Sequence, residues 1–338
     1  MRLFTYTIIS LLFLSIASCS YFYGDKQNVV KEGHLYIYPN ATYQQVLDSL
    51  KPFLKDIEQF DAVAQAEEYD RYVKPGKYFI KEGETNEEIA LKLKNGDEEQ
   101  VKVMVQNSPT IFHLARGASK HIYADSADIV EAILENPTFK EKGLDLETSK
   151  MYFIPNTYFF NWITTGEGFV ERMITEHGKF WNDERKQLLA NSGMTELEVY
   201  TLASIVQMEA SKADEQPKVA QAYLNRLKQG RKLEADPTSV YAYKLEHGFD
   251  EKIQRVYHKH LKTASAYNTY QVTGLPPAPI TLPNGTAIDA VLKPEKHDYI
   301  FFCADPDRPG YHSFTSSYAE HLKNAAKYRK WLKENNIK

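Results

Sequence analysis

The stretch that most constrains this chain is TELEVYTLASIVQME, residues 195–209, in which a carboxylate follows a long apolar run. Thr195 and Glu198 have the spacing of a capping box, in which each side chain accepts a hydrogen bond from the backbone N–H of the other residue. A helix is therefore predicted to begin here. Residues four apart share one face of a helix, so Ile205 and Glu209 are expected to point the same way.

Glu209 is accordingly predicted to lie among apolar side chains. A carboxyl group in such surroundings loses solvation of its charged form, so we expect its pKa to be raised. A raised pKa is what a general acid requires at neutral pH. The same residue also stands at the predicted C-terminal end of the helix, where a glutamate can simply be solvated. The helix alone leaves both interpretations open.

The N-terminal residues 3–24 carry no charged side chain. This length is sufficient to span a bilayer and favours a transmembrane anchor. Within it, Ile16-Ala17-Ser18-Cys19 also matches a lipoprotein cleavage box, in which Cys19 receives the lipid. Both interpretations place the rest of the chain outside the cytoplasmic membrane of a bacterium. It is then either a single-pass inner-membrane protein with its folded part in the periplasm, or a lipoprotein.

Composition excludes several classes of function. A net charge of -4, from 41 basic and 45 acidic residues, provides no basic field for nucleic acid. Cys303 has only the anchor cysteine as a partner within the chain, so no disulfide framework is predicted. The histidines are scattered, and neither cysteine nor histidine occurs at metal-ligand spacing. We therefore predict no metal, nucleotide or redox cofactor.

An internal repeat follows the first segment. Residues 36–42 and 79–85 each read as a short strand and a turn that ends in a threonine, Thr42 or Thr85, ahead of an amphipathic helix. Strand, turn and helix at this spacing resemble the LysM-type modules that bind glycan strands. A plain spacer module has the same pattern, so both interpretations stay open.

Three features follow the carboxylate helix. Asn225 lies in a predicted helix over 217–229, where an amide either holds a neighbouring carboxyl in place or caps the helix. Asp236 precedes a proline in a turn composition, and its simplest interpretation is the N-cap of the next helix. Residues 267–280 are rich in aromatic residues and proline and are too long for an ordinary connection, which is typical of functional segments.

Taken in order, these segments resemble the endolytic murein transglycosylase family, the YceG-like proteins. No segment is specific by itself, whereas their joint order from residue 153 to residue 321 is specific. The matching segments are Phe153 to Tyr158, Leu202 to Val206 ahead of Glu209, Val219 to Leu227, Asp236 to Thr238, Tyr267 to Tyr270, Gly274 to Pro277 and His312 to His321.

The resemblance implies an enzyme that cuts nascent peptidoglycan within the glycan strand and leaves a 1,6-anhydro-muramic acid end. It implies that Glu209 is the catalytic residue, and it suggests peptidoglycan synthases as partners. We predict that substrate-positioning roles fall to Asn225, Asp236, Tyr267 and Asn268. The predicted architecture is α+β, with an anchor or signal at 1–24, a LysM-like module at 25–100, a connecting α/β region at 101–190 and a catalytic domain at 191–338.

The chain departs from the family pattern at three places. Gln207 stands where the family often has a first acid two residues before the catalytic one, which leaves Glu209 alone able to give and take a proton. Asn156 stands where an aspartate is usual, so this position is not an obligatory charged catalyst. Residues 282–284, Leu-Pro-Asn, replace the commoner Asn-Pro-Gly, which puts any substrate contact from this loop in doubt.

One carboxyl suffices for lytic cleavage, because the C6 hydroxyl of the muramic acid attacks its own C1 and the nucleophile is already attached to the substrate. A hydrolytic muramidase needs two carboxyl groups, and Glu209 with Asp236 is the alternative pair. A third interpretation is a non-catalytic protein that binds the wall as a scaffold of the elongation machinery. Product analysis separates the two enzymes, and a scaffold would tolerate loss of the Glu209 carboxylate.

Overall fold

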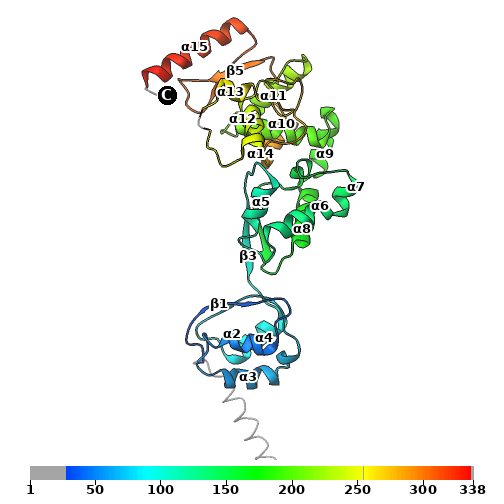
Figure 1. Cartoon of the computed structure of the whole chain (residues 1–338), viewed down its shortest axis with the longest axis vertical. Coiled ribbons are helices and arrows are strands. Elements are labelled where there is room, and N and C mark those ends of the chain that lie inside the picture. The colour runs from blue at the N-terminus through cyan, green and yellow to red at the C-terminus, as the bar shows by residue number, and fades with distance from the viewer. Residues whose placement is uncertain (1–27, 254, 336–338) are drawn as a thin grey trace, which may run out of the picture. The chain divides into compact units, whose positions relative to one another are not determined.

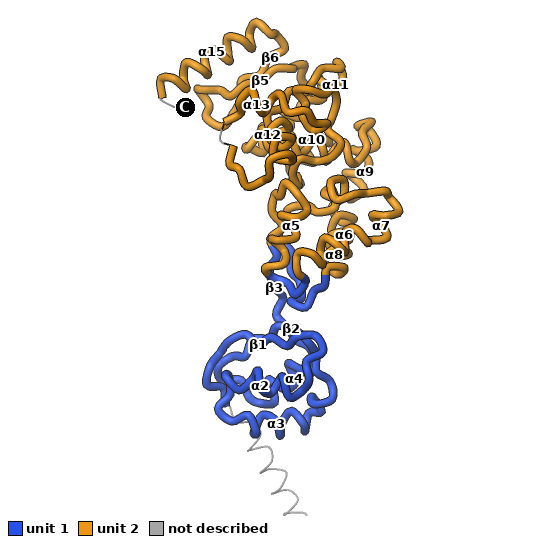
Figure 2. The backbone as a smooth tube through the Cα atoms, viewed as in Figure 1, with its two compact units in different colours: residues 1–103, 121–124, 158–165 blue, residues 104–120, 125–157, 166–338 orange. Residues whose placement is uncertain are grey.

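The computed structural model describes residues 28–253 and 255–335, and these divide into two compact units (Figures 1 and 2). Unit 1 comprises the described residues up to Val103 together with 121–124 and 158–165, and unit 2 comprises the rest. The predicted anchor at 3–24, with Cys19, lies outside the described residues. Within the described ranges, no helix is both long enough and apolar enough to cross a membrane.

The described chain combines helices with two-stranded sheets, which confirms the predicted α+β class. Unit 1 contains β1 (Gly33–Ile37), α2 (Tyr43–Leu50), α3 (Ile57–Ala66), the 3-10 helix η1 (Tyr69–Arg71), β2 (Gly76–Ile80) and α4 (Asn86–Asn95). The division between the units passes through β3 (Gln100–Val105) and β4 (Asn156–Asn161), which pair with each other.

Unit 2 holds the remaining described elements. These are α5 (Ile111–Ala118), α6 (Ser126–Glu135), α7 (Pro137–Glu141), the 3-10 helix η2 (Thr148–Tyr152), α8 (Gly166–Phe180), α9 (Asp183–Ser192), α10 (Glu196–Glu209), α11 (Gln216–Lys228), α12 (Asp236–His247), α13 (His258–Leu261), α14 (Gly285–Leu292), β5 (Phe301–Ala304), β6 (His312–Thr315) and α15 (Tyr318–Glu334).

The repeat predicted in the N-terminal segment is confirmed in unit 1. Thr42 and Thr85 each form a capping box at the start of α2 and α4, and β1 pairs antiparallel with β2. Alternate strand residues such as Leu35 and Ile37 turn into a core that also includes apolar residues of the helices. Between the copies lies α3, which begins at the N-cap Asp56 and was not predicted.

The core of unit 2 is organised around α10. Its capping box of Thr195 and Glu198 forms as predicted. Every residue from Val199 to Val206 is buried, and α11, α12 and α14 all pack against the helix. A helix that is buried all round is a central core helix rather than an amphipathic surface helix. Glu209 is the last residue of this helix and directly follows its buried part.

The C-terminal part of unit 2 is a hairpin covered by a helix. β5 and β6 pair antiparallel, with Ala304 opposite His312, and α15 packs against both strands. Figure 1 shows β5 in orange and α15 in red at this end of the unit. The apolar run at 299–304 is typical of a buried strand, whereas residues 301–304 are all partly exposed. Residues 301–304 and His312 line the cavity described below and are partly exposed.

The unit boundary is close to one of the predicted domain boundaries. The division after Val103 lies three residues beyond the predicted end of the first module at 100. Residues 104–120, 125–157 and 166–190, predicted as a connecting region, cluster with the segment that carries Glu209.

Candidate active site

Glu209 is the last residue of α10, and Ala210 follows it in an extended conformation. The extended backbone ends the helix and leaves the Glu209 side chain at the end of a rigid, buried element. The Gln216 amide, at the start of α11, donates a hydrogen bond to the Ala210 carbonyl at 3.1 Å. The position of Glu209 is therefore set from both sides, by the core helix before it and by α11 after it.

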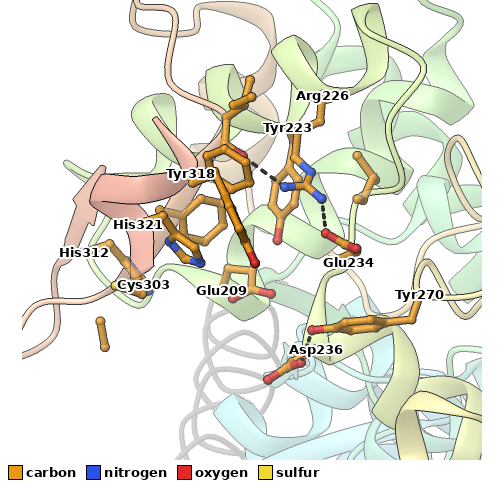
Figure 3. Close-up of a pocket in the computed structure, with 15 residues that line it drawn as sticks. Glu209, Tyr223, Arg226, Glu234, Asp236, Tyr270, Cys303, His312, Tyr318 and His321 are labelled. Carbon is orange, nitrogen blue, oxygen red and sulfur yellow. Dashed lines mark hydrogen bonds and ion pairs between the residues drawn. The ribbon is translucent and has the colours of Figure 1, made fainter. Parts of the chain in front are cut away.

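Glu209 faces a cavity of about 520 Å³ in unit 2 (Figure 3). The cavity combines aromatic faces with polar groups, which is the composition of a site for a polar ligand with apolar faces, such as a sugar. Its lining residues are Glu209, Tyr223, Arg226, Leu233, Glu234, Asp236, Tyr270, residues 300–304, His312, Tyr318 and His321.

The environment of Glu209 favours its protonated form. Burial raises the pKa of its carboxyl to about 7, and the nearby negative charge of Asp236 acts in the same direction. Hydrogen bonds donated by the Tyr223 hydroxyl and by the backbone N–H of Asp236 oppose this rise in the pKa. The prediction of a raised pKa is confirmed. The residue retains partial exposure, so both forms of the carboxyl are accessible to a ligand near neutral pH.

Tyr223 donates a side-chain hydrogen bond to Glu209. It lies on α11 and is 1% exposed. Burial and the neighbouring carboxylate raise the pKa of its hydroxyl well above the ordinary value, so it remains a hydrogen-bond donor across the physiological range. In Figure 3 its hydroxyl points toward Glu209.

Asp236 lies at the edge of the same cavity. It is the first residue of α12, and Ala235 is the N-cap, so the expectation that Asp236 caps the helix is wrong. The Asp236 carboxylate is exposed and accepts a hydrogen bond from the Tyr270 hydroxyl at 2.7 Å (Figure 3). The turn before α12 is held by a hydrogen bond from the Ala235 N–H to the Thr269 hydroxyl at 3.0 Å.

Arg226 also lines the cavity and is 6% exposed. Its guanidinium donates to the carbonyls of Lys232 at 2.8 Å and Ile300 at 3.0 Å, and it pairs with Glu234 (Figure 3). These contacts join α11, the turn before α12 and the start of β5. The guanidinium thus holds the cavity walls together.

Three of the residues predicted to position substrate lie outside the cavity lining. The Asn225 amide donates to the carbonyls of His297 and Tyr299, each at 2.9 Å, and so holds the chain that enters β5. The Tyr267 hydroxyl donates to Glu147 at 3.3 Å, beside the buried Lys150. Neither side chain is brought to Glu209. The structure therefore brings only Asp236, of the predicted partners, to the same cavity as Glu209.

Asn268 acts on the cavity through its neighbour in the chain. It is fully buried, and its side-chain oxygen accepts a hydrogen bond from the backbone N–H of Tyr270 at 3.1 Å. Its amide nitrogen donates to a set of main-chain carbonyls, those of His260 at 3.5 Å, Leu261 at 3.1 Å and Thr263 at 2.8 Å. Asn268 therefore fixes the loop that presents Tyr270 to Asp236.

The residues at the family departures have structural roles. The Gln207 amide donates to the Leu282 carbonyl at 3.3 Å and accepts from the Asn284 N–H at 2.7 Å. An acid at 207 would lose the donor of this pair, so the changes at 207 and at 282–284 are linked by direct contact. Asn156 is exposed at the start of β4 and is not among the lining residues.

Tyr223, Tyr270 and Arg226 line the cavity, and sequence reasoning did not single them out as site residues. Tyr270 and Arg226 belong to the segments that carry the family resemblance, which was the available signal. Tyr223 also lies in one of these segments, Val219 to Leu227, but its contact with Glu209 joins two helices, and local sequence does not indicate such a contact. Among the described residues, no cluster of His, Cys, Asp and Glu could hold a metal ion.

An α+β fold with a partly buried acid of raised pKa facing a polar and aromatic cavity defines a protein equipped for acid–base chemistry on a polar ligand. The chain matches the model of the YceG-like family over residues 35–327 and belongs to that family.

Known relatives agree with this assignment. Over 178 residues the chain is 33% identical to an endolytic murein transglycosylase of Bacillus subtilis, with 52% of this chain and 47% of the relative covered. It is 26% identical over 212 residues to an endolytic murein transglycosylase of Streptococcus pneumoniae, with 60% and 37% covered. The matches thus span less than half of the length of either relative.

The fold is also known from a solved structure. A crystal structure of a YceG-like protein from Listeria monocytogenes matches with a TM-score of 0.54 at 22% identity, over 87% of this chain and 99% of that chain. At this level of identity, the likeness concerns the fold.

Proposed function

We propose that this chain is an endolytic lytic transglycosylase of peptidoglycan. In this role it is a lyase that cleaves the β-1,4 bond between N-acetylmuramic acid and N-acetylglucosamine in nascent strands, leaves a 1,6-anhydro end and terminates strand elongation. The observation that carries the proposal is the Glu209 carboxyl, which has a pKa of about 7 and faces a polar and aromatic cavity. The names of the Bacillus and Streptococcus relatives support the same activity.

The mechanism needs one protein carboxyl. Protonated Glu209 donates its proton to the glycosidic oxygen, and the bond from that oxygen to C1 of the muramic acid breaks. The C6 oxygen of the same sugar then bonds to C1, and the C6 hydroxyl proton passes to the Glu209 carboxylate. No water is consumed, and Glu209 ends the cycle protonated. A pKa near neutrality suits both steps, because an acid and its conjugate base are then both available.

The proposal is tested by whether the new sugar ends of the product are 1,6-anhydro or reducing. The full chain, purified in detergent, is incubated with peptidoglycan in water enriched in ¹⁸O. The masses of the released sugars are then measured by mass spectrometry. We expect 1,6-anhydro ends without ¹⁸O from the wild type and no products from Glu209→Gln. Glu246→Gln, a matched change of an exposed residue on α12, is expected to behave as the wild type. Reducing ends that carry ¹⁸O would contradict lytic chemistry.

A hydrolytic muramidase is the second candidate, because Asp236 lies in the same cavity and its charge acts on Glu209. In a hydrolase, Asp236 would serve as the nucleophile or the base, so Asp236→Asn would abolish cleavage. In the lytic mechanism Asp236 only tunes Glu209, and Asp236→Asn is expected to retain activity with an altered pH dependence. Measuring cleavage by Asp236→Asn across pH separates the two.

We further propose that unit 1, which contains the LysM-like module predicted at 25–100, binds glycan. The support is a cluster of aromatic rings on its surface, in which Trp162 lies edge-on to Tyr36, Tyr38 and Tyr123 at centroid distances of 5.0, 5.1 and 5.8 Å. These tyrosines are 41%, 56% and 46% exposed. Exposed aromatic faces suit the apolar faces of sugar rings.

Glycan binding by unit 1 is tested in the Glu209→Gln background, where the substrate is not consumed. Tyr38→Ala is expected to weaken cosedimentation of the full chain with peptidoglycan. Tyr72→Ala is the matched control, since Tyr72 is 63% exposed in the same unit and lies outside the aromatic cluster. Equal cosedimentation of both variants would leave unit 1 as a spacer.

We also propose that residues 3–24 anchor the chain in the bacterial inner membrane, with the described part in the periplasm. The support is the uncharged N-terminal sequence. Metabolic labelling with a palmitate analogue decides the kind of anchor. Label that is lost on Cys19→Ser indicates a lipoprotein, and membrane association without label indicates a transmembrane helix.

Peptidoglycan synthases are the partners we propose, in line with the family resemblance. Chemical crosslinking in cells, followed by mass spectrometry of the captured proteins, tests this association. A scaffold without enzymatic activity is the remaining alternative. It predicts that Glu209→Gln supports normal strand lengths in cells, whereas the lytic proposal predicts longer glycan strands.

A further inference from the structure

A second polar pair lies at the cavity, away from the groups that support Glu209. His312, on β6, lines the cavity, and its ring Nδ1 lies 2.8 Å from the Glu215 carboxylate. The other oxygen of Glu215 accepts a hydrogen bond from the His312 backbone N–H at 2.7 Å. Both carboxylate oxygens of Glu215 are thus directed at a single residue.

Glu215 has the properties of a residue that orients a histidine. It is 6% exposed, and it stands at the N-cap position of α11, where the helix dipole favours a negative charge. A buried carboxylate accepts hydrogen bonds, so the neutral imidazole carries its proton on Nδ1 and leaves Nε2 as an acceptor. A carboxylate that accepts from one ring nitrogen also fixes the orientation of the other.

The ring of His312 is held in place on its faces as well. Phe302, on the paired strand β5, lies edge-on to it, with centroids 5.3 Å apart and an interplanar angle of 82°. The preceding residue, Tyr311, donates its hydroxyl to Asp214 at 3.0 Å. β6 is therefore tied at consecutive positions to the segment that links Glu209 to α11.

The second ring nitrogen has no hydrogen-bond partner among residues 28–253 and 255–335. Nε2 of His312 makes no hydrogen bond within the described part of the chain, and it is not among the buried unpartnered atoms. His312 lines the cavity, and an oriented ring whose second nitrogen is neither hydrogen-bonded within the described residues nor fully buried is equipped to receive a hydrogen bond from a ligand there. Sugars carry many hydroxyl donors.

We infer that His312 is a substrate-binding residue whose Nε2 accepts a hydrogen bond from a sugar hydroxyl, and that Glu215 is its positioning residue. The inference rests on the proposed function, because it takes the ligand of the cavity to be a glycan strand. It assigns the wall formed by β5 and β6 to sugar recognition and leaves proton transfer to Glu209.

His312→Asn tests the inference, because the asparagine amide can still donate to Glu215 while nothing replaces Nε2. Binding of purified, uncrosslinked glycan strands is measured by calorimetry with the full chain in the Glu209→Gln background. We expect His312→Asn to weaken binding by about fivefold to tenfold, the effect of one neutral hydrogen bond, with an unchanged melting temperature. Ser313→Ala, the next position on β6 and outside the cavity lining, is expected to bind as the parent does.

Unchanged affinity of His312→Asn would overturn the inference, since a purely structural contact with Glu215 is retained in that variant. Failure of the Glu209→Gln parent to bind glycan would instead overturn the proposed function, and this inference with it. If His312→Asn does not fold, ¹⁵N spectra of the histidine rings in the parent decide. We expect glycan to shift the Nε2 signal of His312, and an unmoved signal would refute the contact.

Discussion

Tyr223→Phe is the change that most specifically probes the acid. The substitution removes the hydroxyl that donates to the Glu209 carboxylate and leaves the ring, which is 1% exposed, in place. The hydrogen bond stabilises the charged form of Glu209, so its loss raises the pKa further above the present value of about 7. A hydrogen bond to a charged group contributes about 1.5–3 kcal/mol, and one pKa unit corresponds to about 1.4 kcal/mol, so the expected rise is about one to two units.

The pH dependence of kcat/KM measures this shift. Cleavage requires protonated Glu209, so the rate falls as pH rises through the pKa of the free enzyme. Release of soluble muropeptides by the full chain, followed from pH 5 to 10, is expected to show this alkaline limb at higher pH in Tyr223→Phe. Tyr243→Phe removes a hydroxyl from α12 that lies outside the cavity and serves as the control. An alkaline limb that stays in place, or moves to lower pH, would refute the hydrogen-bond argument.

The remaining predictions concern the same cavity. Asp236→Asn removes the negative charge that raises the pKa of Glu209, so its alkaline limb is expected to move to lower pH by up to about one unit, opposite to Tyr223→Phe. The folded protein holds the Glu209 proton more tightly than the unfolded chain, so it loses stability as pH rises from 4.5 to about 7. Glu209→Gln is therefore expected to raise the free energy of unfolding at pH 8 by on the order of 2–3 kcal/mol and to leave it unchanged at pH 4, as measured by urea denaturation; equal effects at both pH values would disprove the burial of the charge. Asn268→Ala leaves several buried carbonyls without a hydrogen-bond donor and is expected to lower the free energy of unfolding by about 2–4 kcal/mol. An unchanged free energy of unfolding would show that the loop is held by other contacts.

Local signals predicted the elements that carry their own caps. The capping box at Thr195 located the start of α10, and therefore the position of Glu209 at its end. Thr42 and Thr85 did the same for α2 and α4. These signals work because a cap depends on residues three apart in the chain, whatever the tertiary structure.

Two elements without a clear apolar pattern in the sequence, α9 and β4, were not predicted. α9 buries none of its residues, so no apolar face marks it in the sequence. β4 follows Pro155 and pairs with β3, which is distant in the chain, and its first residues read as a turn. Its strand conformation follows from a pairing that local sequence does not encode.

The sequence predicted the central carboxyl of the site, Glu209, but not the residues that surround it. Glu209 could be found because its helix is apolar up to that residue. Asn225 and Tyr267 were expected beside it, but each turns its polar group toward main-chain carbonyls or another carboxylate. The direction of a side chain depends on which elements meet, and so does the contact between Tyr223 and Glu209.

We propose that Glu209 is both the acid and the base of lytic cleavage. The most direct test of this proposal is a count, by mass spectrometry, of 1,6-anhydro ends formed per molecule of protein when the full chain acts on peptidoglycan at pH 7. We expect the number of anhydro ends to rise steadily for the wild type and for Glu246→Gln, and not to rise above background for a folded Glu209→Gln. Anhydro ends formed by Glu209→Gln at the wild-type rate would contradict it.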